Sequence, residues 1–155
     1  MTDITSLSDL RVRTRRLELR LGSRDELVEL GRLAEQGVHP PEEMPFAIAW
    51  TDDIGTPDFV DSFVAYHEGH LESWSPEKWT LNLLVWEHGE LTGTQGMLAE
   101  GFHERRAVHT GSWLGRVFQR RGIGTEMRAA ALELAFRGLG ATRAESSWLE
   151  GNEAS

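Results

Sequence analysis

Residues 111–125 read GSWLGRVFQRRGIGT, and this stretch decides the fold that we expect. Residues 109–118 predict a strand, and Gly122 opens a helix whose apolar residues recur at helical spacing. Gly122 and Gly124 allow another molecule to approach the backbone, and the free amides of the first helical turn carry the positive end of the helix dipole. Arg120 and Arg121 add positive charge. The stretch therefore predicts a pyrophosphate cradle, with a plain strand-to-helix turn as the alternative.

Two well-known phosphate motifs fit this stretch poorly. A Walker loop needs Gly-Lys-Ser/Thr after its second glycine, but Gly124 is followed by Thr125 and Glu126. A dinucleotide fingerprint needs a third glycine where Met127 stands, although Glu145 lies at the expected distance for its acidic residue. A nucleotide-binding regulator is therefore the weaker alternative.

The rest of the chain predicts helices packed on a central sheet. Ser23 and Glu26 form a capping box at the start of the first helix, which ends at Gly37. A second helix follows Thr56 as N-cap and Pro57. The expected segments are strand 17–21, helix 23–37, helix 57–74, hairpin strands 79–87 and 91–100 around His88-Gly89, strand 109–118, a helix from Gly122 to Gly140, and strand 141–150. The fold class is thus mixed α/β (α+β), with a mostly antiparallel sheet.

Length and composition narrow the classes of function. The 155 residues predict one domain over 1–155, with a loose arm at 1–10. The net charge of −9 disfavours nucleic acid as a partner, and the lack of cysteine excludes thiolate chemistry. No apolar stretch has the length of a membrane span and no signal peptide is evident, so we expect a cytoplasmic protein without a membrane partner.

Histidines and aromatic residues offer weaker signals. His67-Glu68-Gly69-His70 lacks the spacing of a metal site, so two ordinary helix histidines and no metal are expected. His103 and His109 are expected at the surface, and the arginines of 11–16 on a solvated edge. Phe46 and Trp50 lie in the long connection 39–57 and are candidates for lining an acceptor groove.

Residues 111–155 resemble the core of the GCN5-related N-acetyltransferases. The signature Q/R-x-x-G-x-G/A is present as Gln119 to Gly124, and Asn-x-x-Ser as Asn152 to Ser155. The amino-acid sequences of the helix that Gly122 opens and of the Asn-x-x-Ser end resemble those of the branch of ribosomal-protein N-terminal acetyltransferases. The resemblance implies an N-acyltransferase that uses acetyl-CoA or another acyl-CoA and an amine acceptor. A catalytically silent acyl-CoA-binding sensor or interaction domain is the alternative.

The resemblance also implies roles for individual residues. Backbone amides of the loop would hold the pyrophosphate, and the edge of the strand at Trp113 and Leu114 would bind pantetheine. The strands at 109–118 and 141–150 must separate to admit pantetheine, so Gly115 is expected at a bulge. The implied cofactor-binding residues are Trp113, Leu114, Gln119, Arg120, Arg121, Gly122, Ile123, Gly124, Thr125 and Asn152.

The implied reaction is direct attack of a neutral amine on the thioester, with the Leu114 amide stabilising the oxyanion. Family members often use a tyrosine after the Asn motif as the acid, but Tyr66 lies in the wrong helix. Some members of the resembled branch use the serine of Asn-x-x-Ser, so the resemblance implies Ser155 as the candidate acid. Glu100 is a candidate base because it ends a strand beside the central one.

The sequence stops at Ser155, where the next helix of the family's fold would begin, so the last helix and strands are absent from it. We expect this sequence to be shortened, with a natural chain that lacks these elements as the alternative. The strand at 141–150 would then have an open edge and a partly exposed Trp148, which favours a homodimer. We expect a protein ending there to be inactive unless a partner chain covers that edge.

Overall fold

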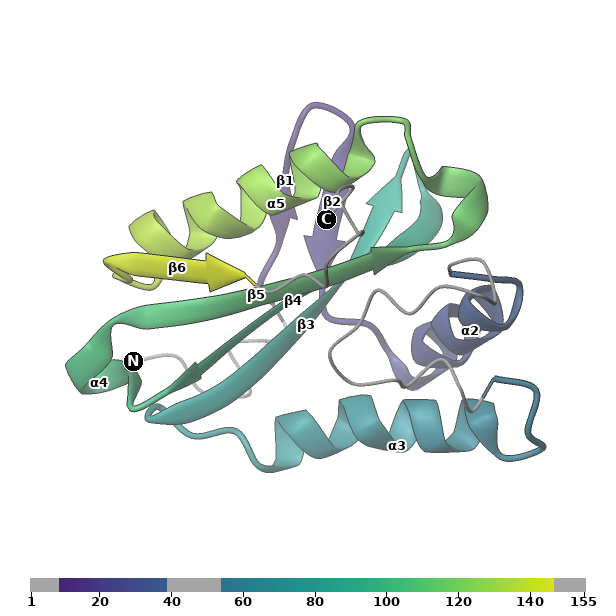
Figure 1. Ribbon diagram of the computed structural model, residues 1–155, viewed down its shortest axis with the longest axis horizontal. Helices are drawn as coiled ribbons and strands as arrows, with labels where there is room; N and C mark the ends of the chain where they lie inside the picture. The colour runs from purple at the N-terminus through teal and green to yellow at the C-terminus, as the bar shows by residue number, and fades with distance from the viewer. Residues whose placement is uncertain (1–8, 39–53, 147–155) are drawn as a thin grey trace.

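The sheet has six strands in the order β1-β2-β3-β4-β5-β6 (Figure 1). The computed structural model describes residues 9–38 and 54–146. The strands are β1 (Val12–Arg13), β2 (Leu17–Arg20), β3 (Lys78–Glu87), β4 (Glu90–Glu100), β5 (Ala107–Leu114) and β6 (Arg143–Ser146). All neighbouring pairs are antiparallel except β5 and β6, which are parallel. The mixed, mostly antiparallel sheet predicted from the sequence is confirmed.

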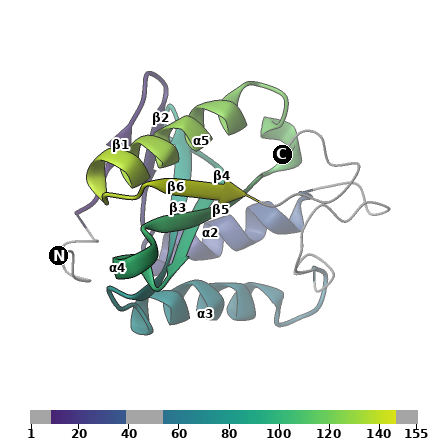
Figure 2. The ribbon, with the colours of Figure 1, turned by 60° about the vertical axis from the view of Figure 1, so that its left-hand side comes forward.

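Helices cover both faces of the sheet. They are α2 (Arg24–Glu35), α3 (Phe59–Glu72), α4 (Phe102–Arg105), the 3-10 turn η2 (Arg116–Phe118), α5 (Ile123–Glu133) and the π turn η3 (Leu134–Gly138) that continues α5. Figures 1 and 2 show α5 on one face and α2 with α3 on the other. Among the described residues, none of these helices combines the length and apolar character that a membrane crossing requires.

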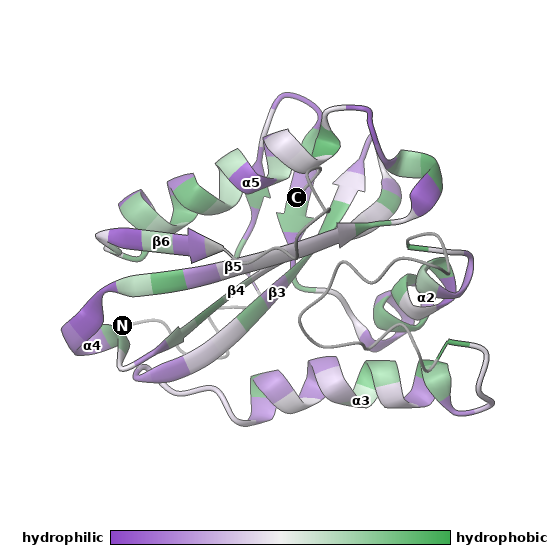
Figure 3. Ribbon diagram, in the orientation of Figure 1, coloured by the Kyte–Doolittle hydropathy of each residue, from purple (hydrophilic) through white to green (hydrophobic). Residues whose placement is uncertain are grey.

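Two hydrophobic cores result, one on each face. On β3, Leu83 belongs to the core under α5, and its neighbour Leu84 belongs to the core under α2 and α3. Successive side chains of a strand point to opposite faces, so a central strand covered on both sides is apolar throughout. The apolar stripe of α5, with Ile123 and Met127 fully buried, alternates with hydrophilic positions along the helix (Figure 3).

The predicted capping box at the start of α2 is confirmed. The Glu26 amide donates to Ser23 Oγ over 3.2 Å, and the Ser23 amide donates to Glu26 Oε1 over 2.9 Å. The Arg20 guanidinium donates to Glu26 Oε1 over 2.8 Å and to Glu26 Oε2 over 2.6 Å. This pairing lowers the pKa of Glu26 to about 2. The junction between β2 and α2 is therefore held by a charged, bidentate pair as well as by the cap.

Several local expectations need correction. β5 ends at Leu114 and is followed by η2, so residues 115–118 do not belong to the strand. Gly115 is no bulge, because its amide donates to Thr92 O over 2.9 Å in continuation of the β4–β5 ladder. A Cβ there would lie 2.8 Å from Leu33 Cδ1, so the glycine instead permits close approach of α2.

The second helix also starts differently. Its N-cap is Asp58, which makes no side-chain capping bond, so Thr56 and Pro57 precede the helix. β1 and α4 were not indicated by the sequence, because a two-residue strand and a single helical turn are too short to show a period. The predictions for five residues are not tested, because these residues lie outside the described ranges: Phe46, Trp50, Trp148, Asn152 and Ser155.

Candidate functional site

The loop between β5 and α5 ends in a helix N-terminus with unused amides. Gly122 is the N-cap in a left-handed conformation (φ 81°) and has no side chain to cap the helix. The amides of Ile123, Gly124 and Thr125 cannot bond within the helix, and no described residue accepts from them. Arg121, just before the cap, is exposed. Unused amides at the positive end of a helix dipole form a site for an anion.

The end of β5 lies beside this N-terminus. A Cβ on Gly124 would lie 3.8 Å from Leu114 Cδ1, which is ordinary contact. The register sets which groups of β5 remain available, because hydrogen bonds in an antiparallel pair alternate between the two sides of a strand. Gly115 donates to Thr92 of β4, so the Leu114 N–H and C=O point away from β4.

On that outer side, the described pairing of β6 covers only Ala107 to Thr110 of β5. The Leu114 amide therefore stands at an edge without a described partner strand. Its carbonyl accepts from Gln119 Nε2 over 2.8 Å. By the same alternation Ser112 also faces outward, whereas the backbone of Trp113 faces Thr94 of β4. Of the two residues that the sequence implied for pantetheine binding, Leu114 therefore faces outward and Trp113 does not, and Ser112 is an outward position that the sequence did not indicate.

Gln119 braces the loop from within. Besides the bond to Leu114, its Nε2 donates to Val38 O over 2.6 Å, and the Arg116 amide donates to Gly37 O over 3.0 Å. The segment after α2 thus fixes the start of the loop. Gln119, expected to bind a cofactor, has its side-chain amide engaged in this bracing.

Arg16 holds the other side of the loop. Its guanidinium donates to the Arg121 carbonyl over 2.9 Å and to Glu126 Oε1 over 3.0 Å, and pairs with Glu87 at 3.3 Å. Glu126 also accepts from Thr14 Oγ1, and these bonds, that of Thr14 first, hold its pKa below the usual value. The expectation of a solvated edge is therefore wrong for Arg16. No sequence spacing connects residue 16 with residue 126.

The candidate base Glu100 is not brought to this site. Gly93 pairs with Leu114, and Glu100 lies seven residues further along β4, which is about 23 Å at the rise of a strand. Glu100 is exposed and pairs with Lys78 at 3.6 Å. Tyr66 lies on α3, across the sheet from α5, and is 59% exposed.

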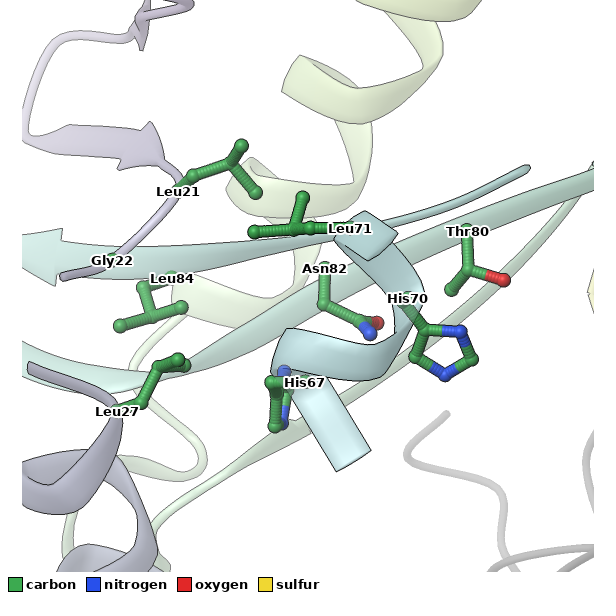
Figure 4. Close-up of a pocket in the computed structure, with 9 residues that line it drawn as sticks. All are labelled: Leu21, Gly22, Leu27, His67, His70, Leu71, Thr80, Asn82 and Leu84. Atoms are coloured by element: carbon green, nitrogen blue, oxygen red, sulfur yellow. The ribbon is translucent and has the colours of Figure 1, made fainter. Parts of the chain in front are cut away.

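His67 and His70 line a small cavity of ≈ 10 Å³ between α3 and β3 (Figure 4). His67 is 7% exposed, and burial, followed by the charge of His70, lowers its pKa to about 4. His70 Nε2 and Asn82 Nδ2 are buried without a hydrogen-bond partner in the described structure. No cluster of three or more His, Cys, Asp or Glu suited to a metal occurs among residues 9–38 and 54–146.

We expect His67 to make the folded state sensitive to acid. Its pKa in the folded state, about 4, lies below the reference value of 6.5. The stabilisation is therefore present above pH 6.5 and is lost as the pH falls toward 4. Between pH 7 and pH 5 the loss is about 2 kcal/mol of unfolding free energy. Urea unfolding of His67→Leu should lack this part of the pH dependence, while the exposed His103→Leu control should retain it. Equal pH dependence in the two variants would contradict the assignment.

The N-terminus of α5 suits the phosphate groups of a ligand, and the Leu114 amide on the neighbouring strand edge suits an extended chain attached to them. Together they form a site for an extended, phosphorylated ligand. The sequence comparison agrees, since residues 16–155 match the family model "Acetyltransferase (GNAT) domain". The chain belongs to the GCN5-related N-acetyltransferase family, and it is an acetyltransferase by class.

Solved structures share the fold. A protein from Vibrio cholerae assigned as a ribosomal-protein-serine acetyltransferase is 24% identical with a TM-score of 0.70, over 94% of this chain and 77% of that one. RimJ of Mycobacterium smegmatis, in complex with CoA-disulfide, is 19% identical with a TM-score of 0.71, over 89% and 65%. An acetyltransferase of Salmonella typhimurium that modifies the N-terminal serine of L7/L12 is 18% identical with a TM-score of 0.71, over 94% and 78%.

Proposed function

We propose that the protein transfers an acetyl group from acetyl-CoA to a primary amine, either a protein N-terminus or a small molecule. The observation that carries this proposal is the placement of the Leu114 amide on the outer edge of β5, where no described strand pairs with it, beside the amides of Ile123, Gly124 and Thr125, from which no described residue accepts. The family match and the CoA-disulfide bound to the similar RimJ structure support it.

The described residues fit this cofactor. Three amides without an acceptor in the described part of the chain, together with the exposed Arg120 and Arg121, suit a pyrophosphate. The outward groups of Ser112 and Leu114 suit the amides of pantetheine. Gln119 and Arg16 act as positioning residues that hold the two sides of the loop. Asn152 remains a sequence-based proposal for pantetheine binding.

The cofactor supplies a thioester activated for attack by an amine. In the transfer, a C–N bond forms, the C–S bond breaks, the amine loses a proton, and the departing thiolate gains one. The Leu114 N–H is the donor proposed for the carbonyl oxygen as it becomes an oxyanion. Ser155 is kept as the proposed acid. The position of Glu100 favours water, rather than this carboxylate, as the first acceptor of the amine proton.

The experiment is an acceptor panel with acetyl-CoA, read by mass spectrometry and by release of free thiol. Peptides beginning with serine belong in the panel because the similar Salmonella enzyme modifies an N-terminal serine. Small primary amines and the same peptides with blocked N-termini complete it. A mass gain of one acetyl group on free amines only, with matching thiol release, is the expected result. CoA binding without turnover on any acceptor would instead favour the silent acyl-CoA-binding domain.

Replacing Arg16 with lysine should weaken CoA binding by about tenfold. A lysine ammonium cannot serve Glu126, Glu87 and the Arg121 carbonyl together, so the loop loses one of its two braces. Calorimetric titration with CoA measures the effect. Arg137→Lys is the matched control, because the pair that Arg137 forms with Glu133 is exposed and lies at the far end of the helix. Unchanged affinity in Arg16→Lys would show that the loop holds its shape without this brace.

A further inference from the structure

A second cavity of ≈ 410 Å³ lies at the other end of the molecule. Its lining includes Trp74, Glu77, Trp79, Phe102, His103 and Arg106. In Figure 1 this is the end where α4 and the last turns of α5 lie, opposite the β5–α5 loop. Ala107, next to Arg106, is seven residues from Leu114 along β5, which is about 23 Å. The cavity is therefore separate from the proposed acyl-transfer site, and its volume is typical of small-molecule sites.

One wall of this cavity is aromatic and fixed. The rings of Trp74 and Trp79 are stacked with centroids 6.5 Å apart, and the ring of Phe102 meets Trp79 at a steep angle with centroids 5.5 Å apart. Trp79 and Phe102 are 6% and 8% exposed and belong to the main core. A rigid aromatic wall of this kind suits a flat, apolar ligand.

The lining includes two donor side chains, those of Trp74 and Arg106. The indole Nε1 of Trp74 is buried and has no hydrogen-bond partner in the described structure. A buried donor without an acceptor destabilises the folded protein, so a native protein rarely keeps one without a reason. Arg106 is half-buried over the Phe102 ring, with Cζ 5.5 Å from the centroid, and forms no ion pair with any described carboxylate. The side chain of Glu77, which also lines the cavity, is exposed.

The backbone holds Arg106 in place. Arg106 adopts a left-handed conformation (φ 50°), which is strained for a residue other than glycine. Its amide donates to Phe102 O over 2.9 Å, and its carbonyl accepts from the Thr142 amide over 2.7 Å. These bonds tie α4 to the start of β6 and keep the guanidinium at the cavity.

We propose that this cavity binds a small aromatic carboxylic acid. The ring lies against Trp79 and Phe102, and the carboxylate accepts from the Trp74 indole N–H and pairs with the Arg106 guanidinium. A carboxylate suits both groups, because it offers two acceptor oxygens and a negative charge to pair with the Arg106 guanidinium. This site goes beyond the proposed acetyl transfer and does not depend on it.

The test uses 1-naphthoate as probe on the full chain, with 1-naphthalenemethanol as its uncharged counterpart. Calorimetry should show saturable 1:1 binding of naphthoate and at least tenfold weaker binding of the alcohol. In ¹⁵N spectra, naphthoate should shift the indole resonance that is missing in Trp74→Phe. The affinity for CoA should be the same with and without naphthoate.

Variants locate the contacts. Arg106→Gln should weaken naphthoate at least tenfold, and Arg137→Gln, which changes an exposed arginine, should not. The acid and alcohol are compared on the unaltered protein, so the proposal stays testable even if Arg106→Gln does not fold. No saturable binding at millimolar naphthoate, equal binding of the alcohol, an unshifted Trp74 resonance, full affinity in folded Arg106→Gln, or competition with CoA would each overturn the proposal.

Discussion

Replacing Gly124 with aspartate is expected to weaken CoA binding by at least a hundredfold while leaving the protein folded. Gly124 is the second residue of α5, and its amide is one of the three that no described residue uses. A carboxylate there places a negative charge where the pyrophosphate is proposed to bind. A hundredfold corresponds to about 2.7 kcal/mol, a reasonable loss for a charge placed against an anion site.

The fold should tolerate this change for two reasons. A Cβ at position 124 meets only Leu114 Cδ1, at 3.8 Å. An acidic residue in the first turn of a helix also stabilises it by about 0.3–1 kcal/mol. Calorimetric titration and thermal unfolding measure the two effects separately, with Arg137→Ala as the control at the far end of the helix. Equal CoA affinity in the wild type and in Gly124→Asp would refute the placement of the pyrophosphate.

Replacing Gly93 with alanine should destabilise the protein by about 3 kcal/mol. The new Cβ would lie 2.2 Å from the Trp113 carbonyl oxygen and 2.8 Å from Leu114 Cα. Both atoms belong to backbone, which cannot turn aside, so β4 and β5 must separate at the proposed oxyanion donor. CoA affinity should therefore fall together with stability.

Gly111→Ala is the matched control for this change. Gly111 lies in the same β4–β5 pair, opposite Gly96, and a Cβ there meets nothing within 4 Å. Urea unfolding should find this variant close to wild type. If Gly93→Ala and Gly111→Ala are equally stable, the close approach of the two strands does not constrain residue 93.

The local features of this protein could be read from its sequence, and the long-range ones could not. The Ser23 capping box and the glycine turn at Gly122 depend on residues a few positions apart, so their spacing predicts them directly. The role of Arg16 depends on Glu126, 110 residues away, and no spacing rule connects them.

The register between neighbouring strands is a second feature that could not be predicted from the sequence. Whether Trp113 or Leu114 offers its amide to the outer edge of β5 depends on how that strand pairs with β4, and a shift of one residue would exchange them. The position of Glu100 shows the same point, because a strand end beside β5 can lie at either end of the sheet. The antiparallel pairing places it away from Leu114.

Amide hydrogen exchange of the full chain, with and without CoA, tests the central claim most directly. Amides of a first helical turn and of an open strand edge exchange rapidly when nothing accepts from them, and a bound ligand should slow them. The account predicts that saturating CoA protects the segment from Ser112 to Glu126, with no change in α3. Unchanged exchange in that segment at saturating CoA, or protection confined to another part of the chain, would contradict it.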